Sequence, residues 1–278
     1  MINNAIQLKA KVRNLSGSDD AVAKSYIRIF FMERFMERVS VSVYKDNFIL
    51  KGGMLVSSLL GVDLRTTMDI DTTINALPLT ESDVSKIIRE ICGIELGDNV
   101  SFKLTGTETI MDDFDYPGVR IKIEAMLDRM KQPLKIDIST DDVITPRAIE
   151  YKYRLLFEDR SIMLNTYNIE TTLAEKSQTI LSRGLANTRM RDIYDVYELV
   201  NNLEFSWELA RKAFMATCQK RGTPFSKNKI AEELDIISAS SDMATAWSMF
   251  RDKNHYVGDL DYKTVIIDVC KSISLIAG

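Results

Sequence analysis

Three aspartates stand at positions where their carboxylates could hold a divalent metal ion. Asp69 and Asp71 are separated by one residue, and on an extended strand both side chains would project from the same face. Asp137 lies between Ile136 and Ile138, so it points away from the apolar side of its own strand. Carboxylate oxygens are ligands that Mg²⁺ prefers, and the ion is usually held by one or two of them together with substrate phosphates. The three acids therefore predict a site for a hard cation.

Such a site suits the transfer of a phosphoryl or nucleotidyl group. Two metal ions roughly 3.5 to 4 Å apart stabilise the attacking and the leaving oxygen of an in-line displacement at phosphorus. A Gly52-Gly53 turn precedes the paired acids, and Asp137 would supply the third carboxylate of the clamp. The alternative is that Asp-x-Asp is a common tripeptide and that these acids line a solvated strand face.

A lysine in the second half of the chain also occupies a position where chemistry could occur. Leu173 and Ile180 mark the inward stripe of an expected helix, and the spacing places Lys176 on the same stripe. An inward lysine needs an anion, and a triphosphate is a natural candidate because the ammonium can offset charge that develops during transfer. The alternative is that the stem of Lys176 packs on the stripe while its amine reaches solvent.

The next expected helix begins with a cluster of basic and acidic residues, namely Arg189, Arg191, Asp192 and Asp195. The two aspartates lie about one helical turn apart. Each also has an ordinary explanation. Asp192 could cap the first amides of the helix and interact with its dipole, and Asp195 could pair with Arg191 at a surface.

Composition excludes several other kinds of protein. The chain has 278 residues, 45% of them hydrophobic, which is enough for one large domain or two moderate ones. Cys92, Cys218 and Cys270 are odd in number and widely spaced, which argues against disulfides and a zinc site and favours a reducing cytoplasm. The single histidine, His255, argues against histidine-based hydrolases. No segment has the roughly 20 apolar residues that cross a bilayer, and Met1–Arg13 lacks the apolar core of a signal peptide.

The overall charge gives little reason to expect nucleic-acid binding, because the formal net charge is only −4. One segment differs from this average. Between Phe205 and Ile230 a single acid, Glu208, is accompanied by six basic residues, Arg211, Lys212, Lys220, Arg221, Lys227 and Lys229. They could contact RNA phosphates, or they could be ordinary surface residues on a solvated helix face.

Hydrophobic spacing predicts that the chain is α/β in its first half and helical in its second. In the first half, helices are expected at 27–38, 54–60 and 80–92, and strands at 48–50, 67–74, 100–104, 119–127 and 134–138. After Pro146, helices are expected at 169–183, 191–203, 206–219, 227–238, 244–251 and 262–276, with one extended stretch at 162–164. We therefore predict a domain at 1–150 and a mainly helical domain at 151–278.

Taken together and in order, the motifs resemble those of the AbiEii-type toxins. The four motifs are Gly52-Gly53 with Asp69-x-Asp71, then Lys135-Ile136-Asp137-Ile138, then Leu173-Ala174-Glu175-Lys176, then Arg189-x-Arg191-Asp192-x-x-Asp195. AbiEii-type toxins are abortive-infection, type IV toxin–antitoxin nucleotidyltransferases of the DNA polymerase beta superfamily. The resemblance runs from about Phe30 to Leu203. Four motifs in one order, with compatible secondary structure, are far more specific than one.

The resemblance implies a role for each matching residue. It implies metal binding by Asp69, Asp71 and Asp137, and nucleotide binding by Gly52, Gly53, Lys176 and Arg191. It implies that the catalytic residues are Asp69, Asp71, Lys176, Asp192 and Asp195, of which a fourth-motif aspartate would position or activate the acceptor. The fold implied is a nucleotidyltransferase-type mixed sheet with flanking helices, followed by an all-helical half that contributes Lys176, Asp192 and Asp195 to the site.

The resemblance also implies Mg²⁺ as cofactor, a nucleoside triphosphate as donor, and a cognate antitoxin that need not form a stable complex. We therefore expect a cytoplasmic, metal-dependent nucleotidyltransferase that acts as a toxin in antiviral defence, with tRNA or another RNA as the candidate acceptor. A small-molecule or protein acceptor is the first alternative. A nucleotide-binding regulator without turnover is the alternative of another class.

Overall fold

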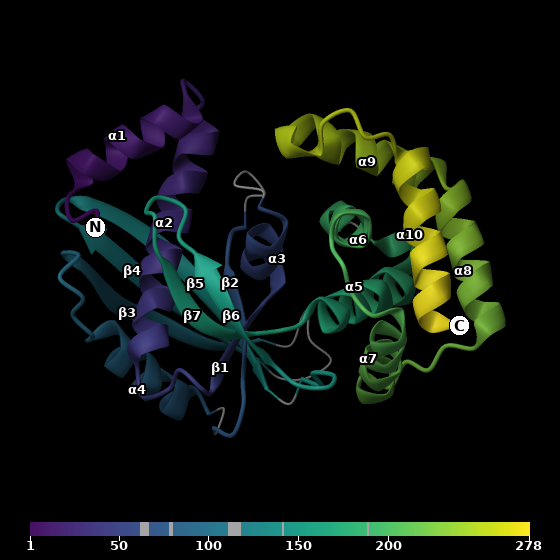
Figure 1. Ribbon diagram of the computed structural model, residues 1–278, viewed down its shortest axis with the longest axis horizontal. Helices are drawn as coiled ribbons and strands as arrows, with labels where there is room; N and C mark the ends of the chain where they lie inside the picture. Colours follow the sequence, from purple (N-terminus) through teal and green to yellow (C-terminus); the bar gives the residue numbers. More distant parts are fainter. Residues whose placement is uncertain (62–66, 78–79, 111–117, 141, 188) are drawn as a thin grey trace. The chain divides into compact units, whose positions relative to one another are not determined.

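The computed structural model describes residues 1–278 except 62–66, 78–79, 111–117, 141 and 188 (Figure 1). The chain divides into two compact units. The sheet unit comprises Met1–Ser58, the described part of Thr66–Asp141, and Ile149–Thr166. The helical unit comprises Asp142–Ala148 and the described part of Tyr167–Gly278, together with the described part of Leu59–Arg65. The domain boundary expected at residue 150 stays a prediction; one strand of the sheet, Ile149–Arg154, spans it and another, Ser161–Thr166, follows it.

A mixed sheet forms the centre of the sheet unit. Its described strands are β1 (Phe48–Lys51), β2 (Ile70–Ile74), β3 (Val100–Ile110), β4 (Gly118–Leu127), β5 (Met130–Thr140), β6 (Ile149–Arg154) and β7 (Ser161–Thr166). They lie in the order β3-β4-β5-β2-β1-β7-β6. Strand β2 runs parallel to β5, and β1 runs parallel to β7, whereas the other neighbouring pairs are antiparallel. The expected fold class, a mixed sheet followed by an all-helical half, is therefore confirmed.

Helices cover this sheet. Those in the first half of the chain are α1 (Ala5–Ser16), α2 (Asp20–Val41), α3 (Gly52–Leu60) and α4 (Glu81–Cys92). Helix α2 packs on β5 and β7, α4 packs on β3 and β4, and the two helices contact each other, as Figure 1 illustrates. The apolar side chains of β5, Ile136 and Ile138, are fully buried, which confirms the face expected for them.

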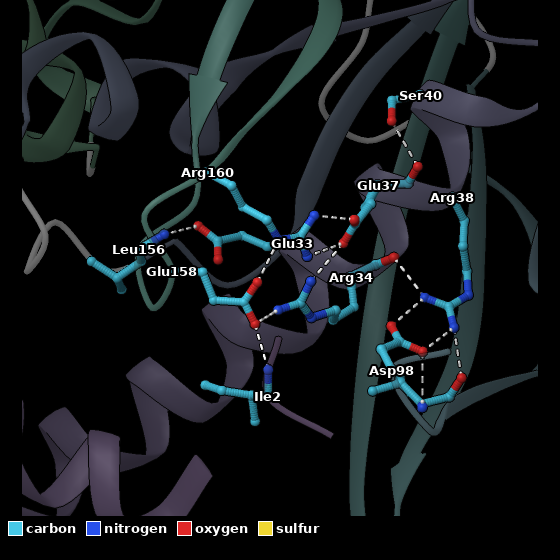
Figure 2. Close-up of polar contacts among 11 residues, drawn as sticks. Ile2, Glu33, Arg34, Glu37, Arg38, Ser40, Asp98, Leu156, Glu158 and Arg160 are labelled. Carbon is cyan, nitrogen blue, oxygen red and sulfur yellow. Dashed lines mark hydrogen bonds and ion pairs between the residues drawn. The ribbon is translucent and has the colours of Figure 1, made fainter. Parts of the chain in front are cut away.

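Helix α2 differs from the amphipathic helix that its sequence predicts, because its charged residues are buried too. Glu33, Arg34, Glu37 and Arg38 are all buried, and each finds polar partners inside the sheet unit (Figure 2). The guanidinium of Arg38 donates to both carboxylate oxygens of Asp98 at 2.9 Å each. Such a pairing is required, since a buried charge without a partner is strongly destabilising.

The same network ties the start of the chain to the turn between β6 and β7. Glu158 in that turn accepts hydrogen bonds from Arg34 at 2.5 Å and from the backbone N–H of Ile2 at 2.6 Å. Arg160 pairs with both Glu158 and Glu37. Figure 2 shows these side chains converging from three separate segments. The contacts explain why α2 can carry charges on its inner faces.

Glu33 gives this network a predictable pH dependence. Its carboxylate accepts the backbone N–H of Leu156 at 2.9 Å, but burial raises its pKa to about 8. Between about pH 4.5 and 8, the carboxyl group of Glu33 is therefore protonated in the folded state but ionised in the unfolded state. The stability contributed by this proton is complete below that interval and is lost as the pH rises through it.

We therefore expect Glu33→Gln, which keeps the acceptor and removes the titration, to stabilise the protein at pH 9 by a few kcal/mol relative to the parent. At pH 4.5 the two proteins should unfold alike. Melting temperatures measured from pH 4.5 to 9 check this. A constant difference between the two proteins at every pH would contradict the shifted titration of Glu33.

Helices alone build the core of the helical unit. They are α5 (Ile169–Arg183), α6 (Met190–Asn202), α7 (Trp207–Lys220), α8 (Lys227–Ala239), α9 (Ser241–Lys253) and α10 (Tyr262–Ala277), with short 3₁₀ turns at Gly184–Ala186 and His255–Val257. Helix α5 packs on α6, α7 and α8, and α10 packs on α6 to α9 (Figure 1). No helix in the described part of the chain has the length and apolar character needed to span a membrane.

Two elements were not expected from the sequence. Helix α1 buries only Leu8 and Val12, so its periodic signal is weak. Strand β6 lies at the edge of the sheet and buries only Tyr153, although apolar and charged residues alternate along Ile149–Arg154. The strand expected at 67–74 begins later, at Ile70, and Asp69 stands in the bend before it. Helix α1 packs on α2, and β6 pairs with β7, so each segment is held mainly by the next element of the chain.

Candidate active site

Four charged residues form a row across the middle of the sheet. Lys51 on β1 pairs in register with Asp71 on β2, and Asp71 pairs with Asp137 on β5. Asp137 in turn pairs with Arg120 on β4. Residues in register on neighbouring strands project from the same face, so the row reads positive, negative, negative, positive. The structure therefore brings Asp71 and Asp137 together, as the sequence predicts.

The carboxylate of Asp137 is paired with the guanidinium of Arg120. Nε of Arg120 donates to its Oδ1, and another guanidinium nitrogen donates to its Oδ2, each at 2.8 Å. This two-pronged pairing is the strongest geometry available to an arginine and a carboxylate. It leaves Asp137 7% exposed and raises the pKa of Arg120 above its ordinary value. Asp137 can therefore join a metal site only at the expense of this pair.

The backbone at the start of α3 approaches the carboxylate of Asp71 closely. The backbone N–H of Gly53 points at Oδ2 of Asp71 from 3.4 Å. Gly52, which begins α3 with a positive φ of 64°, passes so near that an added Cβ would lie 2.1 Å from the same oxygen. Only glycine combines this φ with this approach. Burial, together with the charge of Asp137, raises the pKa of Asp71 to about 6, so its anionic form is poorly compensated.

Asp69 joins the same group from the bend before β2. Burial, together with the charge of Asp137, raises the pKa of Asp69 above its usual value. Lys135, Arg120 and Arg28 act in the opposite direction through their positive charges. The two aspartates of the Asp-x-Asp motif therefore share one electrostatic environment, although only Asp71 belongs to the strand.

Asp69 and Asp71 fit a site in which two carboxylates hold a divalent cation. Among the described residues, no group of three or more His, Cys, Asp or Glu side chains is arranged as a metal site. Burial and the charge of Asp137 nevertheless raise the pKa values of Asp69 and Asp71, so a bound cation would favour their anionic forms. Two carboxylates with substrate phosphates are the usual protein environment of Mg²⁺. Asp137 would be a third ligand only after Arg120 moved.

A second cluster lies in the helical unit, around Lys176. Its ammonium pairs with Asp192 at 2.7 Å and with Asp195 at 2.6 Å, and the side chain of Asp195 is fully buried. The inward position expected for Lys176 is confirmed, and its anions include these two aspartates. The alternative in which Asp195 pairs with Arg191 at a surface is wrong, because Asp195 is not exposed. Asp192 lies in the first turn of α6, whereas the N-cap position belongs to Arg189.

Removing the charge of Lys176 should destabilise the helical unit. We expect Lys176→Met to cost about 3 to 5 kcal/mol, because Asp195 would be left buried without its ammonium partner. Adding Asp195→Asn should restore part of this loss. Lys212→Met removes an exposed lysine that pairs with Glu208 at 2.7 Å and should change the melting temperature little. Calorimetric melting of the four proteins checks this, and equal losses from both lysine variants would contradict it.

The other predicted binding residues are less well supported by their surroundings. Arg191 is half-buried, and its Nε has no hydrogen-bond partner among the described residues. The basic segment loses part of its available charge, since Lys212 is paired with Glu208 and Arg221 with Glu175 at 3.4 Å. This segment therefore gives less support to RNA binding than its sequence suggests.

Lys51 and Arg120 are site residues that the sequence motifs do not predict. Alternation in β4 does place Arg120 on the polar face of its strand, and Lys51 directly precedes the glycines. Neither signal tells which strand lies next to which. That information comes only from the register of β1, β2, β5 and β4.

Comparison with solved structures shows the same fold in two bacterial proteins. The protein JHP933 from Helicobacter pylori matches with a TM-score of 0.52 at 13% identity, covering 91% of each chain. A second H. pylori protein, described only provisionally as a nucleotidyltransferase, matches with a TM-score of 0.50 at 14% identity, covering 88% of this chain and 91% of that one. A comparison with curated proteins found no match.

The mixed sheet and the two solved structures show a shared fold, and the nucleotidyltransferase class follows from a match to a protein family. A family model described as "Nucleotidyl transferase AbiEii toxin, Type IV TA system" matches residues 34–266. The chain therefore belongs to this family of toxins from type IV toxin–antitoxin systems, and the resemblance drawn from the four motifs is confirmed.

Proposed function

We propose that this protein transfers a nucleotidyl group from a nucleoside triphosphate to an acceptor hydroxyl, and that this transfer is its toxic activity. In the reaction the acceptor oxygen forms a bond to the α-phosphorus, the bond between the α-phosphorus and the bridging oxygen breaks, and pyrophosphate leaves while the hydroxyl gives up its proton. The observation that carries the proposal is the poorly compensated Asp71, which lies beside Asp69 and against the start of α3.

In this proposal Asp69 and Asp71 hold Mg²⁺. The bound ion would neutralise the two carboxylates, orient the triphosphate and stabilise the charge that develops on its oxygens. Gly52 and Gly53 allow the triphosphate to approach the backbone at the start of α3, where helix amides favour an anion. The close approach of Gly52 to Asp71 supports this arrangement, because it brings the metal ligand and the phosphate-binding turn together.

The residues of the helical unit act on the same substrates in this proposal. Lys176 binds the triphosphate, with Arg191 as a further nucleotide contact, and Asp192 or Asp195 positions the acceptor. The pairing of Lys176 with the two aspartates supports a shared role, because it orients the ammonium and both carboxylates with respect to one another. A lysine held in this way acts on phosphate as a preset point charge.

We favour RNA, with tRNA as the first candidate, as the acceptor, and a small molecule or a protein side chain is the alternative. The exposed basic residues of α7 and α8 support RNA, although the ion pairs of Lys212 and Arg221 reduce that support. A nucleotide-binding regulator without turnover is less well supported, because two carboxylates held close together are costly unless a cation or a proton separates them.

We further propose that the protein acts in the cytoplasm as the toxin of an abortive-infection pair. The family pairs such toxins with an antitoxin. Cys92, Cys218 and Cys270 are all free thiols, which is compatible with a reducing compartment. The antitoxin need not bind the toxin stably for the pair to function.

Transfer of label tests the proposal. The purified protein is incubated with Mg²⁺, with each α-labelled nucleoside triphosphate in turn, and with total tRNA, in parallel with an Asp69→Ala control. We expect label on RNA with at least one nucleotide and none with the control. Transfer should also weaken steeply as the salt concentration rises if RNA is the acceptor.

Other results distinguish the alternatives. Label on protein or on a small molecule, absent from the Asp69→Ala control, would keep nucleotidyl transfer and replace RNA as the acceptor. Growth inhibition that persists in cells expressing Asp69→Ala, together with no label on any acceptor, would contradict the enzymatic proposal and favour a regulator.

A further inference from the structure

Arg120 and a metal ion would compete for the same carboxylate. Both oxygens of Asp137 accept hydrogen bonds from Arg120 at 2.8 Å, and Asp137 pairs in register with the proposed metal ligand Asp71. The guanidinium therefore already supplies the positive charge that a divalent cation would bring to this end of the row. Arg120, Asp71 and Asp137 all belong to the sheet unit.

Arg120 also has another acid close at hand. On its far side it pairs in register with Glu108 of β3, and the charge of Glu108 contributes to the raised pKa of Arg120. Glu108 now bonds to Lys122 at 2.6 Å, and both side chains are exposed enough to rearrange. Arg120, with its side chain 28% exposed, thus lies between a buried acid on β5 and an exposed acid on β3.

We propose that Arg120 is a built-in counter-cation that occupies Asp137 until a divalent metal ion binds, and then shifts toward Glu108 and leaves Asp137 to the metal. This inference rests on the proposed function, since it concerns the same metal site. Arg120 acts here as a positioning residue, because it controls the availability of Asp137 and contacts neither metal nor substrate in the bound state.

The physical basis is a balance of charge. Without a cation, the guanidinium of Arg120 balances the charge of Asp137 and so limits its repulsion with Asp71, its neighbour in register. With a cation bound, the guanidinium becomes a like charge beside the metal and opposes it. Removing the positive charge of Arg120 should therefore tighten metal binding and weaken the metal-free protein.

Manganese binding without nucleotide tests this inference. The free-ion signal of Mn²⁺ in electron paramagnetic resonance gives the affinity of the parent, of Arg120→Gln and of Lys131→Gln. Lys131 is an exposed lysine of β5 that pairs with Glu124 at 3.0 Å, and neither of these two residues takes part in the proposed exchange. We expect Arg120→Gln to bind Mn²⁺ at least about tenfold more tightly than the parent, and Lys131→Gln to stay within about twofold.

Melting temperatures supply a second readout. In EDTA, Arg120→Gln should melt below the parent, and Mn²⁺ should raise its melting temperature more than it raises that of the parent. Arg120→Lys keeps the charge but cannot form the two-pronged pair, so its affinity should lie between those of the parent and Arg120→Gln. If Arg120→Gln does not fold, a tighter Mn²⁺ affinity in Arg120→Lys supports the inference and an unchanged one overturns it.

Three outcomes would overturn the inference. They are an unchanged or weaker Mn²⁺ affinity in Arg120→Gln, equal tightening in Lys131→Gln, and an effect of Arg120→Gln on nucleotide binding alone. The first two leave the proposed function intact as long as Asp71→Asn abolishes Mn²⁺ binding. Parent protein that binds Mn²⁺ no better than Asp71→Asn would instead remove the metal site itself, and with it the proposed function.

Discussion

Replacing Asp71 by asparagine is expected to reduce nucleotidyl transfer by at least about a thousandfold, because a neutral amide cannot replace an anionic metal ligand at the reacting phosphate. Growth inhibition in cells that express the variant should disappear for the same reason. The measurement is label transfer from a nucleoside triphosphate, with growth curves of the expressing cells beside it. This is one of the two largest effects that the structure predicts.

The same substitution should not destabilise the protein. Burial and the neighbouring Asp137 raise the pKa of Asp71 to about 6, so above that pH the folded state carries an unfavourable anion. Asparagine keeps an oxygen that can accept the N–H of Gly53 and removes the charge. We therefore expect Asp71→Asn to melt at or above the melting temperature of the parent at pH 8.

A loss of activity together with retained stability distinguishes a catalytic role of Asp71 from a structural one. Asp46→Asn is a suitable control, because Asp46 is an exposed aspartate in the turn before β1. It should leave both transfer and melting temperature unchanged. If Asp71→Asn kept more than a tenth of the parent's transfer activity, Asp71 could not be the metal ligand of this reaction.

Gly52→Ala is the second substitution with a large expected effect. The new Cβ would lie 2.1 Å from Oδ2 of Asp71, and the backbone there has a φ of 64°. Since the contact is with a half-buried side chain on a strand, either α3 must move or Asp71 must turn away from the position proposed for the metal. We expect transfer to fall by at least about a hundredfold, because small displacements of a catalytic group have effects of this size.

Gly61→Ala is the matched control. Gly61 has nearly the same φ, 63°, and no atom of the described residues lies within 4 Å of an added Cβ. Both variants carry the backbone cost of alanine at positive φ, about 1 kcal/mol, but only Gly52→Ala disturbs Asp71. Melting temperature and label transfer measured on both proteins separate the two effects. Equal activities in the two variants would show that the approach of Gly52 to Asp71 has no bearing on the reaction.

Local sequence patterns were sufficient for most elements of this fold. The helix expected at 169–183 is α5 with the same limits, because apolar residues at helical spacing are bounded by Asn168, which caps the first turn, and by Gly184. The strand expected at 119–127 is β4 almost unchanged, since alternation is strong there. These features depend only on near neighbours in the chain.

Burial of charge could not be predicted in the same way. Spacing along α2 marks Arg34 and Arg38 as residues between apolar positions, which would be solvent-facing on an ordinary amphipathic helix. They are buried because Asp98 and Glu158, far along the chain, supply their counter-charges. Only the packing of distant segments around α2 decides that its polar face is an interior face.

The candidate site also has some features that the local sequence sets and others that packing sets. By itself the sequence determined the four ordered motifs, and thereby the family, the paired aspartates and the inward Lys176, since each of these depends on residue type and short spacing. Tertiary structure alone decided that Asp137 is held by Arg120, that Gly52 touches Asp71, and that Lys176 is shared by Asp192 and Asp195. Strand register and helix packing set which charged side chains meet. The free energy that fixes register and packing comes from contacts between segments that are distant in sequence, so local patterns do not contain it.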